Sequence, residues 1–104
     1  MQLTKEREHL GKQIRKIIGD PTGKCYHASC AFYDLAGGKE AGYKAFRSTH
    51  NGESHWWIQK GNEIIDLTAD QFDFEWPYHE GKGAGFYPNR SLLTRLIISE
   101  ITKG

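Results

Sequence analysis

The sequence predicts an α+β fold in which helices pack on a small antiparallel sheet within one domain, residues 1–104. Three observations lead to this expectation. Two amphipathic helical segments come first, three strand-like segments with a tight hairpin follow, and another amphipathic segment comes near the end. The length of 104 residues suits one domain with a modest core, and 38% hydrophobic with 12% aromatic residues is a globular composition rather than a disordered one.

The first two helices are predicted from apolar residues that recur at helical spacing. A helix at 3–18 carries the stripe Leu3, Leu10, Ile14, Ile17 and Ile18. The turn at 19–23 ends it, and Thr22 is expected to cap a second helix at 23–36. The apolar stripe of this second helix consists of Ala28, Ala31, Phe32 and Leu35. Two consecutive glycines then end the helix.

Strands are predicted at 43–49, 54–59 and 62–67. The segment 69–88 is polar, aromatic and glycine-rich, and we expect a long loop with a flexible lip at 81–85. A last helix is predicted at 90–102. Its expected core face consists of Leu92, Leu93, Leu96 and Ile97.

The hairpin in the stretch SHWWIQKGNEIIDLT predicts a contact between a histidine and an aspartate. If Lys60 and Gly61 form a two-residue turn, His55 lies directly opposite Asp66, with Cβ atoms about 4.5 to 5.5 Å apart. Trp57 then shares their face, because side chains alternate along a strand. A carboxylate in this place fixes the tautomer of the imidazole and stabilises its protonated form.

A cysteine near the start of the second helix gives this pair a candidate partner. Cys25 lies where the unsatisfied N–H groups and the dipole of a helix favour a thiolate, and Lys24 adds positive charge. A histidine within reach would complete an activated nucleophile. Cys30, later in the same helix, is expected to be a small buried residue, and no disulfide with Cys25 is expected.

Three short motifs in this order resemble papain-like cysteine hydrolases, specifically the transglutaminase-like branch. They are Gly23-Lys24-Cys25, His55-Trp56 and Asp66-Leu67-Thr68, and the match covers about residues 22–68. The resemblance implies a papain-like/transglutaminase-like core with a catalytic hairpin. The compact chain with its glycine-rich tail also resembles small proteins encoded by phages and bacteria.

The resemblance implies a cysteine-dependent hydrolase or acyltransferase that cleaves an amide, peptide or isopeptide bond through a thioester. Cys25 would be the nucleophile, His55 the general base and acid, and Asp66 the orienting group. The backbone N–H of Cys25 would be one oxyanion donor, and Gln13 is a weak candidate for a second. The substrate would be a peptide, a protein or a small amide, and no cofactor or metal is implied.

Four further residues are candidates for substrate binding. They are Trp57, Tyr78, His79 and Tyr87. Trp57 is expected to wall the site beside His55, whereas Trp56 faces the helices. The other three lie in the predicted loop. Of the remaining histidines, His9 and His27 are expected to be exposed.

Two other functions remain open on the sequence. The aromatic residues between 56 and 87 are also typical of a non-catalytic binding module. The segment CYHASC offers Cys25, His27 and Cys30 as zinc ligands, and His50, His55 and His79 could add to them. Against zinc, residues 25 and 27 lie about 200° apart around a helix.

The charge and hydropathy patterns bear on partners and location. The formal net charge of +1 gives no reason to expect a nucleic-acid or membrane partner. No apolar run approaches the length of a membrane span, and the charged N-terminal stretch does not resemble a signal peptide. We therefore expect a cytoplasmic protein, and the sequence gives no oligomeric state.

Overall fold

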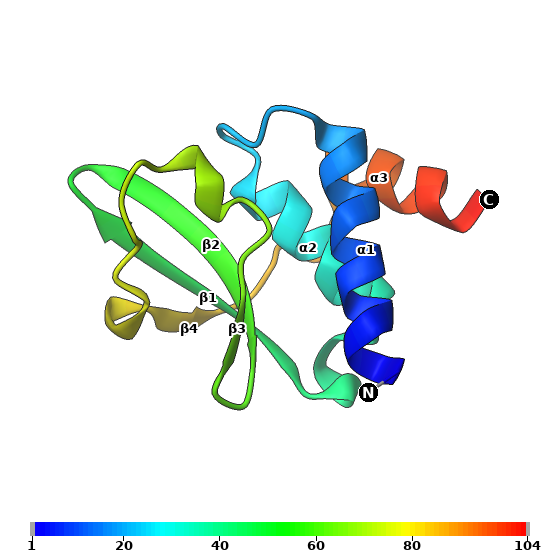
Figure 1. The fold of residues 1–104 in the computed structure, drawn as a ribbon, viewed down its shortest axis with the longest axis horizontal. Helices are drawn as coiled ribbons and strands as arrows, with labels where there is room; N and C mark the ends of the chain where they lie inside the picture. Colours follow the sequence, from blue (N-terminus) through cyan, green and yellow to red (C-terminus); the bar gives the residue numbers. More distant parts are fainter. Residues whose placement is uncertain (1, 104) are drawn as a thin grey trace.

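The computed structural model describes residues 2–103, with side chains from residue 6 onward, so the side chain of Leu3 lies outside the described part. The chain forms three α-helices packed on a four-stranded antiparallel sheet, which confirms the α+β class (Figure 1). The helices are α1 (Gln2–Ile18), α2 (Cys25–Leu35) and α3 (Leu92–Lys103). The strands are β1 (Tyr43–His50), β2 (Glu53–Lys60), β3 (Glu63–Ile65) and β4 (Lys82–Ala84), in the sheet order β3-β2-β1-β4.

The fourth strand corrects the expected loop at 69–88. β4 pairs antiparallel with β1, with Ala84 opposite Ala45 and Gly83 opposite Phe46. Two short 3-10 helices, Ala69–Gln71 and Tyr78–Glu80, also lie in this segment. The expected flexible lip is thus an edge strand, and its three residues, Lys82, Gly83 and Ala84, are too few and too small to give an alternating hydrophobic pattern.

The β2–β3 hairpin is shorter than expected, and its register differs. Lys60 pairs with Glu63, so the two-residue loop consists of Gly61 and Asn62 rather than of Lys60 and Gly61. Gly61 has a φ of +60°, which suits the first position of a two-residue hairpin loop. The expected direct opposition of residues 55 and 66 is therefore wrong, because β3 ends at residue 65 and each pairing moves by two residues. A shift of two keeps both side chains on the same face of the hairpin.

The second helix begins two residues later than expected. Its N-cap is Lys24, and no side chain caps the helix. Thr22 is not the cap, because it lies two residues before Lys24, and its backbone N–H donates to Asp20 Oδ1 at 3.0 Å within the preceding turn. Gly23 has a φ of +74°, a left-handed backbone that helical residues do not adopt. The helix can therefore start only after this residue.

The core face of the last helix is also corrected. Ser91 caps α3, with the Thr94 N–H donating to Ser91 Oγ at 3.1 Å. Thr94 and Ile97 are completely buried, whereas Leu92 and Leu96 are exposed. Leucine alone did not reveal the face, because a hydroxyl that finds a hydrogen bond is as acceptable in the core as an apolar side chain.

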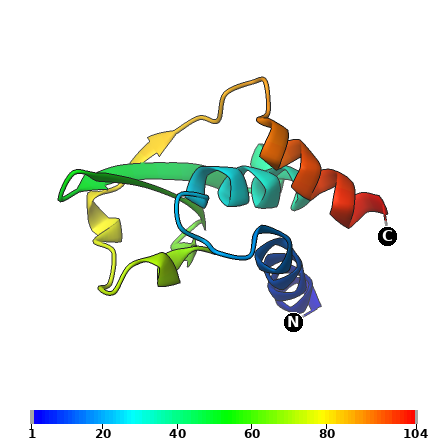
Figure 2. The same ribbon diagram turned by 90° about the horizontal axis from the view of Figure 1, so that it is seen from above.

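One face of the sheet packs against α2, and the 69–81 segment covers the opposite face. Tyr43, Ala45 and Ile58 join α1, α2 and α3 in the core cluster. Figure 2 shows the 69–81 segment on the side of the sheet away from α3. Side chains of β2 on that face, His55 and Trp57, contact aromatic rings of this segment. Within residues 2–103, no helix combines the length and apolar character needed to cross a membrane.

Candidate active site

The structure brings the imidazole of His55 against the carboxylate of Asp66. His55 Nε2 lies 2.6 Å from Asp66 Oδ2, and the two side chains are 0% and 4% exposed. Asp66 follows directly after β3, one diagonal step along the hairpin from His55. The short distance and the burial make this a strong charge-assisted contact.

Asp66 is itself held by two neighbours. The hydroxyl of Tyr78 donates to Asp66 Oδ2 at 2.6 Å, and the backbone N–H of Thr68 donates to Asp66 Oδ1 at 3.2 Å. Thr68 is buried, and its hydroxyl accepts a hydrogen bond from Gln71 Nε2 at 3.1 Å. These donors stabilise a buried carboxylate and fix its orientation.

The short third strand lets α2 approach the site. β3 pairs only with residues 58–60 of β2, which leaves the rest of that edge of β2 without a strand partner. Ser29 Oγ of α2 donates to the carbonyl oxygen of Trp56 at this edge, at 3.3 Å. The first turn of α2, which begins at Cys25, therefore lies beside the part of β2 that carries His55.

Cys25 faces the ring nitrogen that Asp66 leaves free. His55 Nδ1 is buried and has no partner with full hydrogen-bond geometry among the described residues. The Cys25 thiol nevertheless lies close enough for its hydrogen bonding to contribute to the pKa of His55. Because Nε2 of His55 is already bonded to Asp66, we assign the contact with the Cys25 thiol to Nδ1. Cys25 is 9% exposed.

Opposing effects set the protonation of His55. Burial lowers its pKa, since a charged ring is poorly solvated there, but hydrogen bonds to Asp66 and Cys25 and electrostatic interactions with both side chains raise it to about 9. The ring is therefore protonated at neutral pH. An imidazolium beside a cysteine is the partner that a thiolate needs.

Aromatic rings enclose His55 on its buried side. The rings of Phe72 and Trp76 both have centroids 4.9 Å from the imidazole, and Trp57 follows at 5.8 Å. Trp76 is held by a hydrogen bond from its indole N–H to Ser48 Oγ at 2.7 Å. These rings keep water from the His55–Asp66 contact, which strengthens it.

The substrate-binding candidates lie in different places. Trp57 is 0% exposed and backs His55 as a buried wall. Tyr78 joins the site through Asp66. His79 is highly exposed and lies near Glu80, and Tyr87 is 73% exposed, with its backbone N–H donating to the Tyr26 hydroxyl at 2.9 Å.

A cavity of about 500 Å³ lies on the face of β2 opposite to His55, and neither Cys25 nor His55 lines it. It is lined by neighbours of these two residues in the chain, Tyr26, Ser54 and Trp56, together with the exposed Tyr87 and with Arg47. Tyr26 and Trp56 stack with ring centroids 4.9 Å apart. The aromatic lining is suited to an apolar or aromatic group of a ligand.

Gln13 is not part of this site. It lies on α1 and lines a cavity with Glu100 and Ile101 of α3. The structure therefore gives no support for Gln13 as an oxyanion donor. The N–H groups in the first turn of α2, where Cys25 lies, remain candidates because they have no acceptor within the helix.

The cysteine and histidine side chains of the segment CYHASC lie in different environments and do not converge. Cys30 is 1% exposed, and burial raises the pKa of its thiol to about 11. His27, which we expected to be exposed, is half-buried, with Nδ1 2.7 Å from Ser91 Oγ. Burial lowers the pKa of His27. Among the described residues, no three His, Cys, Asp or Glu side chains gather into a possible metal site.

Sequence reasoning missed the supporting residues of the site. The sequence motifs include Thr68 without a role, they do not include Gln71 or Trp76, and Tyr78 was expected to bind substrate rather than Asp66. Thr68 was visible as a residue two positions after Asp66, a spacing that permits a local side-chain to backbone bond. The contacts of Tyr78 and Trp76 cross from a loop to the sheet, so nothing in the local sequence indicates them.

No protein-family model, no curated protein and no solved structure matches this chain. The likeness to papain-like and transglutaminase-like enzymes therefore rests on the three short motifs and on the geometry described above. Cys25, His55 and Asp66 come together in space, whereas their chemical roles remain predictions.

Proposed function

We propose that this chain is a cysteine-dependent hydrolase or acyltransferase with a minimal papain-like/transglutaminase-like core. Its substrate would be an amide, peptide or isopeptide bond. The proposal is supported above all by a buried His55–Asp66 pair and by a thiol at the start of a helix, Cys25, that lies close enough to His55 to affect its pKa. A nucleophile, a base and an orienting group in this order are the elements of covalent acyl transfer.

The proposed reaction starts from a thiolate on Cys25 and a protonated imidazole on His55. The Cys25 thiolate attacks the carbonyl carbon of the substrate, and N–H groups at the start of α2 stabilise the oxyanion that forms. His55 gives its proton from Nδ1 to the leaving amine, so that the C–N bond breaks and a thioester remains. Water or an amine then attacks the thioester, His55 takes the proton from this nucleophile, and the Cys25 thiolate is released.

The test is the alkylation of each cysteine by iodoacetamide, followed by mass spectrometry across a pH series. Cys25 should react at neutral pH, and His55→Gln should slow this reaction at least tenfold, because the thiolate loses its imidazolium partner. Cys30 is the matched control within the same helix and should stay inert. Circular dichroism would verify that the variant keeps its fold. Equal reaction of Cys25 in both proteins, or none in either, would contradict the proposal.

A non-catalytic binding module is the alternative, and the low exposure of Cys25 favours it. In that case the aromatic cavity at Tyr26 and Trp56 would bind a ligand without any covalent step. Activity assays with fluorogenic peptide amides would distinguish the two functions. Turnover by the wild type and its loss in Cys25→Ser would support the enzyme.

A further inference from the structure

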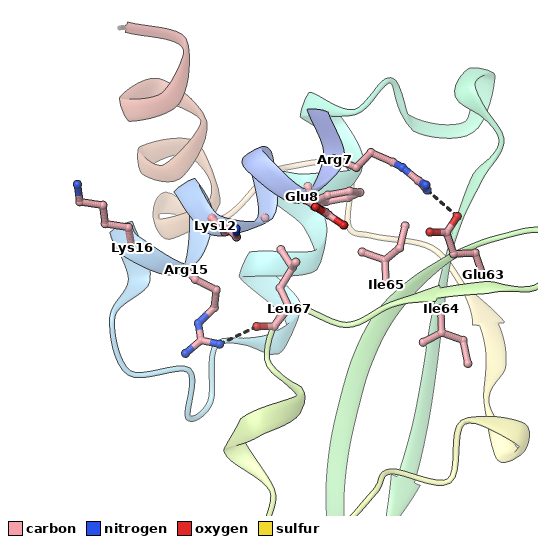
Figure 3. Close-up of a pocket in the computed structure, with 11 residues that line it drawn as sticks. Arg7, Glu8, Lys12, Arg15, Lys16, Glu63, Ile64, Ile65 and Leu67 are labelled. Carbon is pink, nitrogen blue, oxygen red and sulfur yellow. Dashed lines mark hydrogen bonds and ion pairs between the residues drawn. The ribbon is translucent and has the colours of Figure 1, made fainter. Parts of the chain in front are cut away.

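A second cavity lies between α1 and β3, away from the candidate active site. Its volume is about 630 Å³, within the usual range for small-molecule sites, and neither Cys25 nor His55 lines it. Figure 3 shows side chains from α1 on one side and from the β3 strand and the residues after it on the other. Nothing in the proposed function uses this cavity.

The floor of the cavity is apolar. Ile65 and Leu67 point toward α1 in Figure 3, and the buried ring of Phe32 also lines the cavity. Gly11 of α1 lets Leu67 approach, because a Cβ atom at this position would lie only 2.9 Å from Leu67 Cδ2. This floor can hold an alkyl chain, which would gain free energy by leaving water.

The rim of the cavity is predominantly cationic. Four basic residues line it against two acidic ones, and these basic residues are Arg7, Lys12, Arg15 and Lys16. Arg7 pairs with Glu63 and Arg15 with Asp70, both at 2.7 Å. Lys12 is exposed and has no carboxylate within 4.0 Å among the described residues, so its charge is available to a ligand.

Arg15 adds a donor that nothing satisfies. Its Nη1 donates to the carbonyl oxygen of Leu67 at 3.0 Å, as Figure 3 shows, and to Asp70. Its Nε is buried and has no hydrogen-bond partner among the described residues. A buried N–H of a guanidinium without an acceptor is costly, so Arg15 would gain from an anionic group that it can reach by a small movement of its side chain.

We propose that this cavity binds a small amphiphilic anion, an alkyl chain that ends in a carboxylate. The chain would lie on Ile65 and Leu67, and the carboxylate would lie at Lys12 and Arg15. The excess of positive charge selects against a cationic amphiphile of the same length, and an uncharged alcohol would lose the ionic contacts. No covalent step is involved.

The test is a titration of the full chain with decanoate below its micellar concentration, followed by ¹⁵N–¹H NMR. We expect saturable shifts in residues 11–16 and 63–67, weaker binding of decanol and the weakest binding of decyltrimethylammonium. Absence of saturable decanoate binding, shifts elsewhere in the chain, or equal affinity for all three probes would overturn the proposal. The measurement is independent of Cys25, so it does not depend on the proposed enzymatic function.

A pair of lysine variants tests the place of the carboxylate. Lys12→Ala should weaken decanoate binding about fivefold, the loss expected for one partly exposed ionic contact. Lys103→Ala is the matched control. This exposed lysine near the end of α3 lies outside the cavity, and its substitution removes the same charge. An equal effect of both substitutions, or no effect of Lys12→Ala, would refute the assigned position.

Discussion

The His55–Asp66 contact places an imidazole and a carboxylate where almost no water reaches them. Burying two charged groups is costly, and only short contacts and further hydrogen bonds offset that cost. Asp66 has such bonds from Tyr78 and Thr68. The arrangement therefore depends on the negative charge of Asp66 more than on the shape of its side chain.

Asp66→Asn tests this dependence. The substitution keeps the shape but removes the charge that favours the imidazolium, so the pKa of His55 should fall from about 9 by about one to three pH units. An NMR titration of the ring protons measures it. The exposed His9 on α1 is an internal control, because the substitution should leave its signals unchanged. A pKa of His55 that stays near 9 in the variant would show that Asp66 does not set it.

The meeting of His55 with Asp66, and the place of Cys25 at the start of a helix, could be predicted from sequence for a specific physical reason. His55 and Asp66 lie in one hairpin, so the alternation of side chains is enough to place them on one face. Cys25 could be predicted to begin a helix from the glycine before it and the apolar stripe after it. Tyr78 could not be assigned to Asp66, because their contact depends on how a loop returns over the sheet.

At the scale of elements, the 69–81 segment acts as a cover for one face of the sheet. Phe72 and Trp76 pack on His55, and Tyr78 reaches Asp66. Gly81 lies where the cover returns to the sheet, and a Cβ atom there would overlap with the ring of Trp57 and lie 3.1 Å from the carbonyl oxygen of Tyr78. Close approach at this glycine thus helps to hold the cover in place.

Gly81→Ala should therefore destabilise the protein. The added methyl group forces Trp57 or the backbone at Tyr78 to move, at a cost of about 1–3 kcal/mol in the free energy of unfolding. Urea denaturation measures this change. Gly85→Ala is the control, because a Cβ atom there meets nothing within 4 Å, and it should change stability by less than about 0.5 kcal/mol. Equal stability of the two variants would mean that the cover adapts freely.

Helices and strands with a periodic pattern of apolar side chains were easier to predict than a strand that is defined only by its backbone pairing. β1, β2 and the three helices follow apolar patterns, and they lie within a few residues of where the sequence placed them. β4 has only Lys82, Gly83 and Ala84, and its pairing with β1 leaves no such pattern. The hairpin loop lies at Gly61 and Asn62, one residue later than predicted, because glycine suits either position of a two-residue loop.

At the scale of the whole molecule, His55 should make stability depend on pH. Its pKa of about 9 in the folded chain exceeds the ordinary value of 6.5, so folding favours the protonated ring. The stabilisation is complete below about pH 6.5 and is lost as the pH rises through about 9. A shift of this size corresponds to on the order of 3 kcal/mol.

Urea unfolding of the wild type and His55→Gln at a series of pH values measures this contribution. The wild type should exceed the variant in stability by the largest margin near pH 6.5, and the margin should narrow toward pH 9.5, because only the wild type loses a stabilising proton. His9→Gln, which removes an exposed histidine of α1 outside the site, is the control variant. A margin that stays constant or widens with pH would mean that His55 is neutral in the folded chain, and the proton that the proposed reaction takes from Nδ1 would then be missing.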